Sequence, residues 1–159
     1  MAQRSCPRLR PADNNDSDRI TELVFAVLRE YGLAPDPEST DADLKDIEQS
    51  YLKRGGAFFV LEDRPGSIIG AYGLYRIDEA TCELRKMYLR KSFRGRGLGK
   101  LLLDDALTKA RRMGFEKVTL ETASVLTEAI ALYKSYGFAQ YEPAHLSPRC
   151  DQAFVLELK

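Results

Sequence analysis

Several features are scarce or missing in this sequence: it has no tryptophan, one histidine, three cysteines and no excess of either charge. Lysine plus arginine number 24, and aspartate plus glutamate also number 24. Without a surplus of positive charge, we expect neither nucleic acid nor a membrane surface to be bound through bulk electrostatics. Any partner must therefore be recognised by a local site.

Long apolar segments are also missing. The strongest runs, such as Ala57–Leu61 and Leu101–Leu103, are too short to span a bilayer. The first residues contain no apolar core of the length that a secretory signal needs. We therefore expect a cytoplasmic protein that does not enter a membrane.

The few cysteines and the one histidine exclude further classes of site. Cys6, Cys82 and Cys150 fit no zinc or redox spacing, and three thiols cannot all pair with one another. We expect reduced thiols, as is usual in the cytoplasm, and no bound metal. His145 lies in a loop bounded by prolines, which favours a loop or binding role over that of a catalytic base.

The rest of the composition indicates one domain over residues 1–159. Hydrophobic residues make up 44% and charged residues 30%, a globular balance, and this length can bury a sizeable core. In the N-terminal third, apolar spacing predicts a helix that Asp16 or Ser17 caps and Gly32 ends. An extended stretch around Pro7–Pro11 comes before it. A second helix is expected over Ala42–Lys53.

After Gly56 the apolar period changes to that of strands. Two strands are expected on either side of the turn Asp63–Gly66, and a strong helix over Leu98–Arg112. A further helix, Glu128–Tyr136, ends at Gly137. Strands and helices mixed in this order predict an α+β fold. The expected strands are Ala57–Glu62, Ser67–Arg76, Thr81–Arg90, Lys117–Glu121, Phe138–Tyr141 and Ala153–Leu158.

A glycine-rich loop connects the third strand to the long helix. Glycines alternate in Arg94-Gly-Arg-Gly-Leu-Gly99, which we call the glycine loop. The N–H groups of a first helical turn have no intrahelical partner, and glycine lets phosphate oxygens approach them closely. A Walker A loop would need glycine where Arg94 stands, and a dinucleotide fingerprint would need it at Leu102. The loop therefore indicates a phosphate site of another kind, with a plain strand-to-helix connector as the alternative.

The glycine loop matches the pattern Arg/Gln-x-x-Gly-x-Gly/Ala and resembles the signature of the GNAT superfamily of N-acetyltransferases. Ala129–Phe138 is similar to the family's second cofactor-flanking helix with its Tyr-x-x-x-Gly-Phe ending. Glu83–Leu89, Val118–Glu121 and Asp151–Leu158 resemble the family's central, next and closing strands. The resemblance covers residues 57–158. It implies a mixed, mostly antiparallel central sheet with helices on both faces, and acetyl-CoA as the co-substrate.

The resemblance also implies how the cofactor is held. The pantetheine arm would add to the edge of the central strand, and the N–H of Leu89 would polarise the thioester carbonyl. Many relatives carry an asparagine where this chain has Leu126, so the neighbouring Thr127 either replaces that contact or caps the helix. The implied cofactor-binding residues are Met87, Tyr88, Leu89, Arg94, Gly95, Arg96, Gly97, Leu98, Gly99 and Thr127.

Three residues match catalytic positions of the family. Glu83 on the central strand, or Glu121 on the next, would take the proton of the attacking amine. Tyr133 would donate a proton to the departing thiolate, since a phenol has a pKa of about 10. Strand alternation predicts that Glu83 shares a face with Arg85, Met87 and Leu89. The alternatives are an ion pair or a solvated strand end for the glutamates, and packing for Tyr133.

The acceptor is the least defined part of this reading. The resemblance implies a primary amine, of a small molecule or of a peptide or protein. The acidic N-terminal region could favour a cationic acceptor or be a solvated helix face, and tyrosines could line an acceptor groove or pack the core. A non-catalytic acyl-CoA-binding sensor is the main alternative function, another nucleotide-phosphate protein a third, and a homodimer is left open. The acidic residues are Asp36, Glu38, Asp41, Asp43, Asp46 and Glu48; the tyrosines are Tyr31, Tyr51, Tyr72 and Tyr75.

Overall fold

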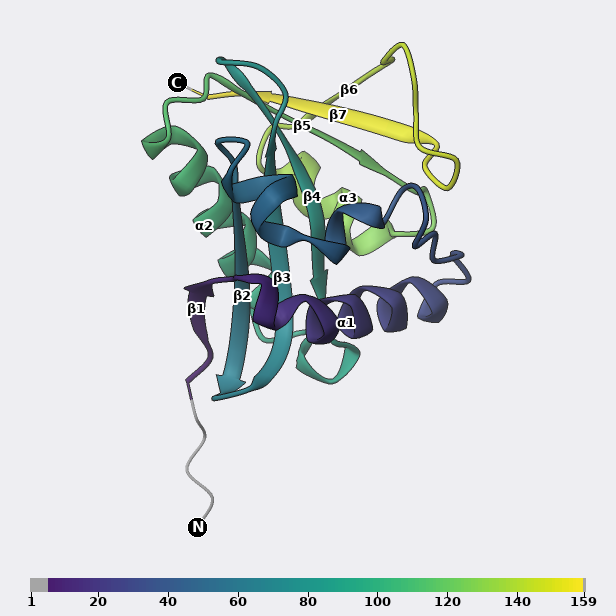
Figure 1. The fold of residues 1–159 in the computed structure, drawn as a ribbon. Coiled ribbons are helices and arrows are strands. Elements are labelled where there is room, and N and C mark those ends of the chain that lie inside the picture. Colours follow the sequence, from purple (N-terminus) through teal and green to yellow (C-terminus); the bar gives the residue numbers. More distant parts are fainter. Residues whose placement is uncertain (1–5, 159) are drawn as a thin grey trace.

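Seven strands form one sheet in the computed structural model, which describes residues 6–158. Their order is β1-β2-β3-β4-β5-β7-β6, and every neighbouring pair is antiparallel except β4 with β5 (Figure 1). The expected mostly antiparallel sheet is confirmed. The strands are β1 (Arg8–Pro11), β2 (Ala57–Arg64), β3 (Ser67–Arg76), β4 (Thr81–Leu89), β5 (Lys117–Thr122), β6 (Ala139–Tyr141) and β7 (Gln152–Glu157).

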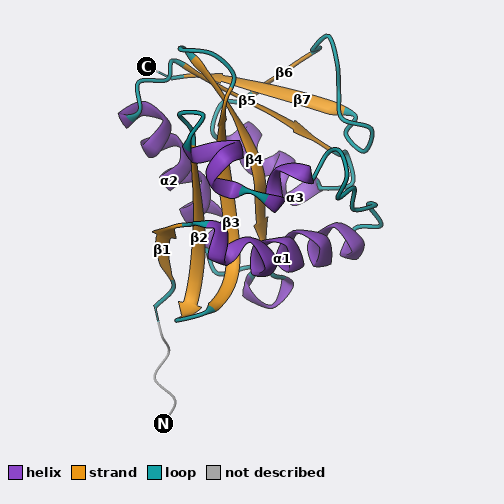
Figure 2. Cartoon of the chain, in the orientation of Figure 1, coloured by secondary structure: helices purple, strands orange, loops and turns teal. Residues whose placement is uncertain are grey.

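Helices cover both faces of the sheet, as expected (Figure 2). On one face, α1 (Ser17–Glu30) and the short helices η2 (Ala42–Lys45) and η3 (Glu48–Leu52) pack on one hydrophobic cluster. On the other, α2 (Leu98–Arg112) and α3 (Thr127–Ser135) pack on a second cluster. The sheet is therefore the middle layer of three.

Two local predictions in the N-terminal third are wrong. The helix expected over Ala42–Lys53 is split into η2 and η3, because Asp46 leaves the helical conformation and its carboxylate accepts the N–H of Gln49 at 2.9 Å. Asp16 stands before α1 but makes no capping hydrogen bond with it. Its carboxylate instead binds Arg10, Arg19 and the N–H of Asp13, within the short turn η1 (Asn14–Asp16).

Strands β4 and β5 diverge after a short parallel contact. Pairing covers only Thr81–Glu83 of β4 against Lys117–Thr119 of β5. Beyond it, the two strands separate while β4 remains paired with β3 up to Leu89 (Figure 1). The second half of β4 therefore presents one unpaired edge to the gap between the strands.

A β-bulge at Lys86 changes the alternation of β4. Lys86 has φ +56°, and the register with β3 shifts by one residue between Arg85 and Tyr88. Met87 and Leu89 consequently pack in the cluster beneath α2, whereas Tyr88 packs in the cluster beneath α1. The expectation that Glu83 shares a face with Met87 and Leu89 is therefore wrong, because the extra residue reverses the facing of every later side chain.

Candidate active site

A cavity of about 440 Å³ occupies the gap where β4 and β5 diverge. One end is lined by Leu89, Gly95 and Gly99, at the start of α2. The other end is lined by Glu83 and Glu121 of the two strands, together with part of the loop 142–151. One elongated cavity thus joins the glycine loop to the two candidate bases.

The glycine loop has the backbone form that a phosphate site requires. Gly95 and Gly97 have φ of +79° and +78°, a region that favours glycine, and an added Cβ would meet no atom within 4 Å at either position. Gly97 precedes the first turn of α2, where no side chain caps the helix and no acidic residue stands. The exposed N–H groups of this turn carry a partial positive charge, so they can bind an anion.

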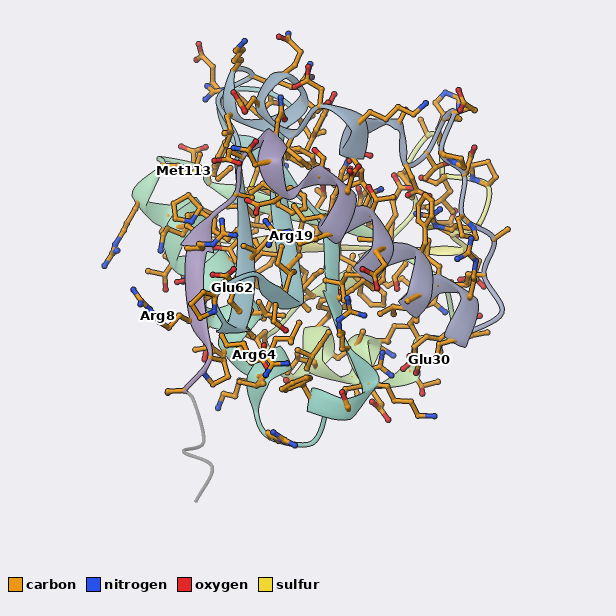
Figure 3. The ribbon with its side chains drawn as sticks, turned by 60° about the horizontal axis from the view of Figure 1, so that its bottom comes forward. Arg8, Arg19, Glu30, Glu62, Arg64 and Met113 are labelled. Carbon is orange, nitrogen blue, oxygen red and sulfur yellow. The ribbon has the colours of Figure 1, made fainter. Side chains whose placement is uncertain are left out.

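The Arg94 side chain has partners within the protein. Its guanidinium donates to the carbonyl of Leu89 from Nε at 3.1 Å and Nη2 at 2.9 Å. It also pairs with Glu30 at the end of α1 (labelled in Figure 3) and donates to the hydroxyl of Tyr31 at 3.1 Å. Arg94 therefore ties the loop to α1, and anion binding at this position falls to the backbone.

The free edge of β4 has the hydrogen-bonding groups expected for a strand-like ligand. Arg90 donates its N–H to Ile69 of β3 at 2.8 Å. Because successive peptide groups of a strand point to opposite sides, the N–H and C=O groups of Met87 and the N–H of Leu89 face the gap. The carbonyl of Leu89 already accepts hydrogen bonds from Arg94. The three residues Met87–Leu89 line the cavity.

Two glutamates line the far end of the cavity. Burial raises the pKa of Glu83, the ion pair with Arg85 opposes that shift, and the charge of Glu121 adds to it. Glu121 accepts hydrogen bonds from the N–H of Ser147 at 2.7 Å and from its hydroxyl at 3.0 Å. Glu83 is thus a carboxylate with a raised pKa, and Glu121 anchors the loop 142–151.

Tyr133 lines the cavity from α3. Only 6% of the residue is exposed, its ring packs on Phe138 with centroids 5.7 Å apart, and burial raises the pKa of its hydroxyl above 10. The phenol therefore stays protonated at neutral pH. Tyr133 therefore both packs against Phe138 and lines the cavity.

Some expected site residues lie outside the cavity. Arg96, Gly97, Leu98 and Thr127 do not line it, although Gly97 sets the turn that opens α2. Thr127 is exposed and does not cap α3, which starts after Leu126 without a side-chain cap, so that alternative is wrong.

The structure divides the acidic residues and the tyrosines of the expected acceptor region. Glu38 and Asp46 are exposed, whereas Asp41 is buried in ion pairs and Asp43 receives the hydroxyl of Tyr51. Of the four tyrosines, only Tyr31 lines the cavity. Tyr51 and Tyr72 are fully buried in the two hydrophobic clusters.

A buried ion cluster beside the cavity was not foreseen from the sequence. Asp41 accepts from Arg149 at 2.6 and 2.7 Å, pairs with Lys86 at 2.9 Å and accepts the N–H of Asp36 at 2.8 Å. Burial alone would raise the pKa of Asp41, but the partners Arg149 and Lys86 outweigh it and lower the pKa to about 2. Asp41 and Arg149 lie 108 positions apart, and no motif links them.

The described residues were also expected to hold no metal site, no membrane-spanning segment and only free thiols. Over residues 6–158, no three histidine, cysteine or acidic side chains come together as metal ligands would. In the same range no helix is long and apolar enough to cross a bilayer. The cysteines are free: Cys6 is exposed, Cys82 is buried and Cys150 lines the cavity. His145 is exposed and lies outside the cavity.

Comparison with known proteins identifies relatives along most of the chain. Residues 21–138 match the model of the acetyltransferase (GNAT) family. An uncharacterized N-acetyltransferase of Escherichia coli K12, YjgM, is 38% identical over 143 residues, covering 87% of this chain and 85% of the relative. An uncharacterized N-acetyltransferase of Schizosaccharomyces pombe is 29% identical over 84% of this chain and 82% of the relative.

Solved structures share the fold as well. A GNAT-family acetyltransferase from Staphylococcus aureus Mu50 superimposes with a TM-score of 0.90 at 23% identity, over 97% of this chain and all of the other. The Salmonella typhimurium protein yncA, a putative acetyltransferase solved with acetyl-CoA, has a TM-score of 0.72 at 26% identity. That match covers 98% of this chain and 95% of the other.

Proposed function

The chain belongs to the acetyltransferase (GNAT) family and is an N-acetyltransferase; from this premise we propose that it moves the acetyl group of acetyl-CoA directly to a primary amine. The observation that supports the proposal most strongly is the single cavity that joins the glycine loop, the free edge of β4 and the two glutamates. A phosphate site, a strand-like slot and a base thus follow one another in the order that a diphosphate, a pantetheine arm and an amine would need.

The diphosphate of the co-substrate would bind the backbone N–H groups between Arg94 and Gly99. These groups stand at the positive end of α2 and are open to solvent. The pantetheine arm would pair with Met87 and Leu89 as a strand pairs with its neighbour. That the yncA structure was solved with acetyl-CoA supports this choice of co-substrate.

Acetyl-CoA supplies an activated acyl carbon, and residues of this chain supply the proton transfers. Glu83 would accept a proton from the amine, directly or through water, as its C–N bond to the acetyl carbon forms. The N–H of Leu89 faces the gap and would stabilise the negative charge that builds on the thioester oxygen. The carbon–sulfur bond then breaks, and Tyr133 would give its proton to the leaving sulfur.

Burial affects the pKa of both the proton donor and the proton acceptor in this last transfer. An exposed phenol has a pKa of about 10 and would suit a free thiol, but burial raises the pKa of Tyr133 further. A thiol in the same cavity is affected in the same direction, since burial raises the pKa of Cys150 to about 11. A thiolate released here would therefore be a stronger base than in water, which offsets part of the effect of burial on the phenol.

Release of free CoA thiol in the presence of candidate amines tests the proposal. The panel should contain amino acids, polyamines, aminoglycosides and peptides. Thiol release with one of these classes supports the transfer. Binding of acetyl-CoA without release on the whole panel would instead favour a non-catalytic acyl-CoA-binding module.

Heat protection separates the proposed co-substrate from other phosphate ligands. A ligand that binds the folded state raises the melting temperature. Acetyl-CoA should raise it, whereas ATP and NAD should not. Equal protection by all three would mean that the glycine loop is a general phosphate site.

A further inference from the structure

Four cationic side chains line the cavity, and three of them use their terminal nitrogens for contacts within the protein. Lys86 donates to the carbonyl of Thr40 at 3.1 Å and pairs with Asp41 at 2.9 Å and with Asp43 at 3.5 Å. Arg149 donates both terminal nitrogens to Asp41. Arg94 is held by Glu30, Tyr31 and Leu89. The terminal nitrogens of these three thus already make contacts within the protein.

Arg85 is different. Its Nε pairs with Glu83, and its guanidinium lies 3.6 Å from the centre of the Tyr75 ring. The two terminal nitrogens have no hydrogen-bond acceptor among residues 6–158, and neither is a buried unsatisfied atom. The side chain is 31% exposed and lines the cavity. Arg85 therefore keeps its fork of N–H donors free at the end where the amine must react.

The charges around this fork favour a zwitterion. Glu83 and Glu121 line the same end of the cavity. Carboxylates suit an amino group here, because the amine enters as a cation and must lose a proton before it reacts. A guanidinium fork matches the two oxygens of a carboxylate and can bind both at once. An amine with a carboxylate a few atoms away satisfies both groups together.

Two loops at this end of the cavity are tied together by an ion pair. The pair Arg149–Asp41 joins the loop 142–151 to the loop 31–41, and Arg149 also reaches the carbonyl of Ala34 at 3.5 Å. Both loops contribute to the lining of the cavity, through Thr40 and Ser147 among others. The N-terminus of a peptide has no free α-carboxylate beside its amine, so a peptide would leave Arg85 without an anion.

We propose that the acceptor is a free amino acid whose carboxylate binds the terminal nitrogens of Arg85 while its amine reaches Glu83. This inference rests on the proposed acetyl transfer and specifies its substrate class. Arg85 is then the residue that determines specificity for the acceptor. The chemistry of the acetyl transfer is the same as that proposed above.

The test compares each of the twenty standard amino acids with its carboxamide in the thiol-release assay. The carboxamide keeps the side chain and the amine but removes the negative charge. Its amine is also less basic, so that more of it is neutral, which biases the assay against the expected result. The wild-type chain should nevertheless show a higher kcat/KM for at least one amino acid than for its amide.

Arg85→Gln should lower the acid-to-amide ratio of kcat/KM by about tenfold or more, through loss of a charge-assisted bidentate contact. Arg85→Lys, which keeps the charge without the fork, should give an intermediate ratio. Arg54→Gln is the matched control, because Arg54 also lies over the Tyr75 ring, at 4.4 Å, but is exposed and outside the cavity. Its ratio should equal that of the wild type. Comparing ratios within one variant removes any general loss of activity or fold.

Wild-type preference for the amides, or an unchanged ratio in Arg85→Gln, would overturn the inference while leaving the proposed transfer intact. Absence of thiol release with every amine would refute the transfer instead. In that case calorimetry of amino acid binding in the presence of CoA decides about Arg85. Binding that is about tenfold weaker in Arg85→Gln supports the carboxylate site, and no binding to the wild type overturns it.

Discussion

Glu83 combines two features that usually exclude one another, an ion pair and a raised pKa. Its partner Arg85 stabilises the charged form, yet burial and the nearby Glu121 act in the opposite direction and prevail. A base is most useful when its pKa approaches the working pH. Glu83 is therefore the better placed of the two glutamates, while Glu121 is engaged with Ser147.

We expect Glu83→Gln to lower kcat/KM for the amine by on the order of 10²-fold or more, because the amide cannot take a proton. The loss should be largest at mildly acidic to neutral pH, where the amine is protonated. In the wild type the rate should fall as the pH drops through the raised pKa of Glu83, since protonation removes the base. Steady-state rates measured across pH check both statements.

Glu121→Gln is the control for that experiment. A glutamine can still accept the hydrogen bonds of Ser147, so the loop 142–151 should keep its place. Its loss of rate should be clearly smaller than that of Glu83→Gln. The reverse order would assign the base to Glu121, and an equal loss at every pH would assign Glu83 a positioning role.

Tyr133→Phe should slow turnover by on the order of 10²-fold with little change in the affinity for acetyl-CoA. The ring and its contact with Phe138 remain in this variant, so that packing is preserved. Single-turnover rates and calorimetry of acetyl-CoA binding separate the two effects. An unaffected rate across pH would mean that the hydroxyl donates no proton.

At the scale of residues, the sequence predicted candidates that a motif carries and missed contacts that only folding brings together. Glu83, Glu121 and Tyr133 follow from strand and helix patterns that resemble a family, and all three line the cavity. The ion pair of Asp41 with Arg149 spans 108 positions and leaves no periodic trace. Which nitrogens of Arg85 remain without an acceptor also depends on where the neighbouring side chains lie, and no sequence spacing encodes this.

At the scale of elements, regular apolar spacing was a reliable guide and local backbone exceptions were not. The bounds of α2 agree with the prediction from its apolar face. The bulge at Lys86 was invisible, because lysine has no preference for a positive φ and its conformation is imposed by pairing with β3. Similarly, Asp46 divides η2 from η3 through its own hydrogen bonds, against the apolar spacing.

We expect a negative charge at the start of α2 to weaken acetyl-CoA binding. Gly97→Asp would place a negative side chain beside the N–H groups of the first turn, so acetyl-CoA affinity should fall by about 100-fold or more. The left-handed backbone at Gly97 adds a cost of about 1–2 kcal/mol in folding free energy. Calorimetry and thermal unfolding measure the two effects separately.

Gly114→Asp is the matched control. Gly114 lies just after α2, has φ +89° and, like Gly97, offers open space to a Cβ. An aspartate there suffers the same backbone strain and a less favourable helix dipole, so its loss of stability should be at least as large. Its affinity for acetyl-CoA should stay at the wild-type value. Equal affinity in the two variants would remove the glycine loop from the site.

At the scale of the whole molecule, the Asp41 cluster connects segments that the sheet alone does not hold. It joins the loop 31–41, the bulge of β4 and the loop 142–151 at one end of the cavity. A second network fixes the start of α1 near β2: Arg10 binds Asp16 and Glu62, and Arg19 binds Asp16. Figure 3 labels Arg19 and Glu62. The first network therefore ties together two loops that line one end of the cavity.

The lowered pKa of Asp41 predicts a pH dependence of stability. A shift from 3.8 to about 2 corresponds to about 2.5 kcal/mol, and because the folded state has the lower pKa, this stabilisation is present above pH 4. It is lost as the pH falls toward 2. Asp41→Asn should be less stable by about 3 kcal/mol at pH 7, since Lys86 and Arg149 lose their buried partner.

Urea unfolding of the two proteins between pH 6 and pH 2 checks this prediction. The difference in free energy of unfolding should shrink as the pH falls from about 4 to about 2. Other carboxylates titrate in both proteins and cancel in the difference. A difference that does not change with pH would mean that Asp41 has an ordinary pKa in the folded state.

A crystal structure of the chain with coenzyme A tests the central claim most directly. The account predicts that the diphosphate lies within hydrogen-bonding distance of the backbone N–H groups between Arg94 and Gly99. It also predicts that the pantetheine arm runs along Met87–Leu89 in the gap between β4 and β5, with its sulfur close to Tyr133. Phosphates bound elsewhere on the surface, or an arm that leaves the gap empty, would contradict it.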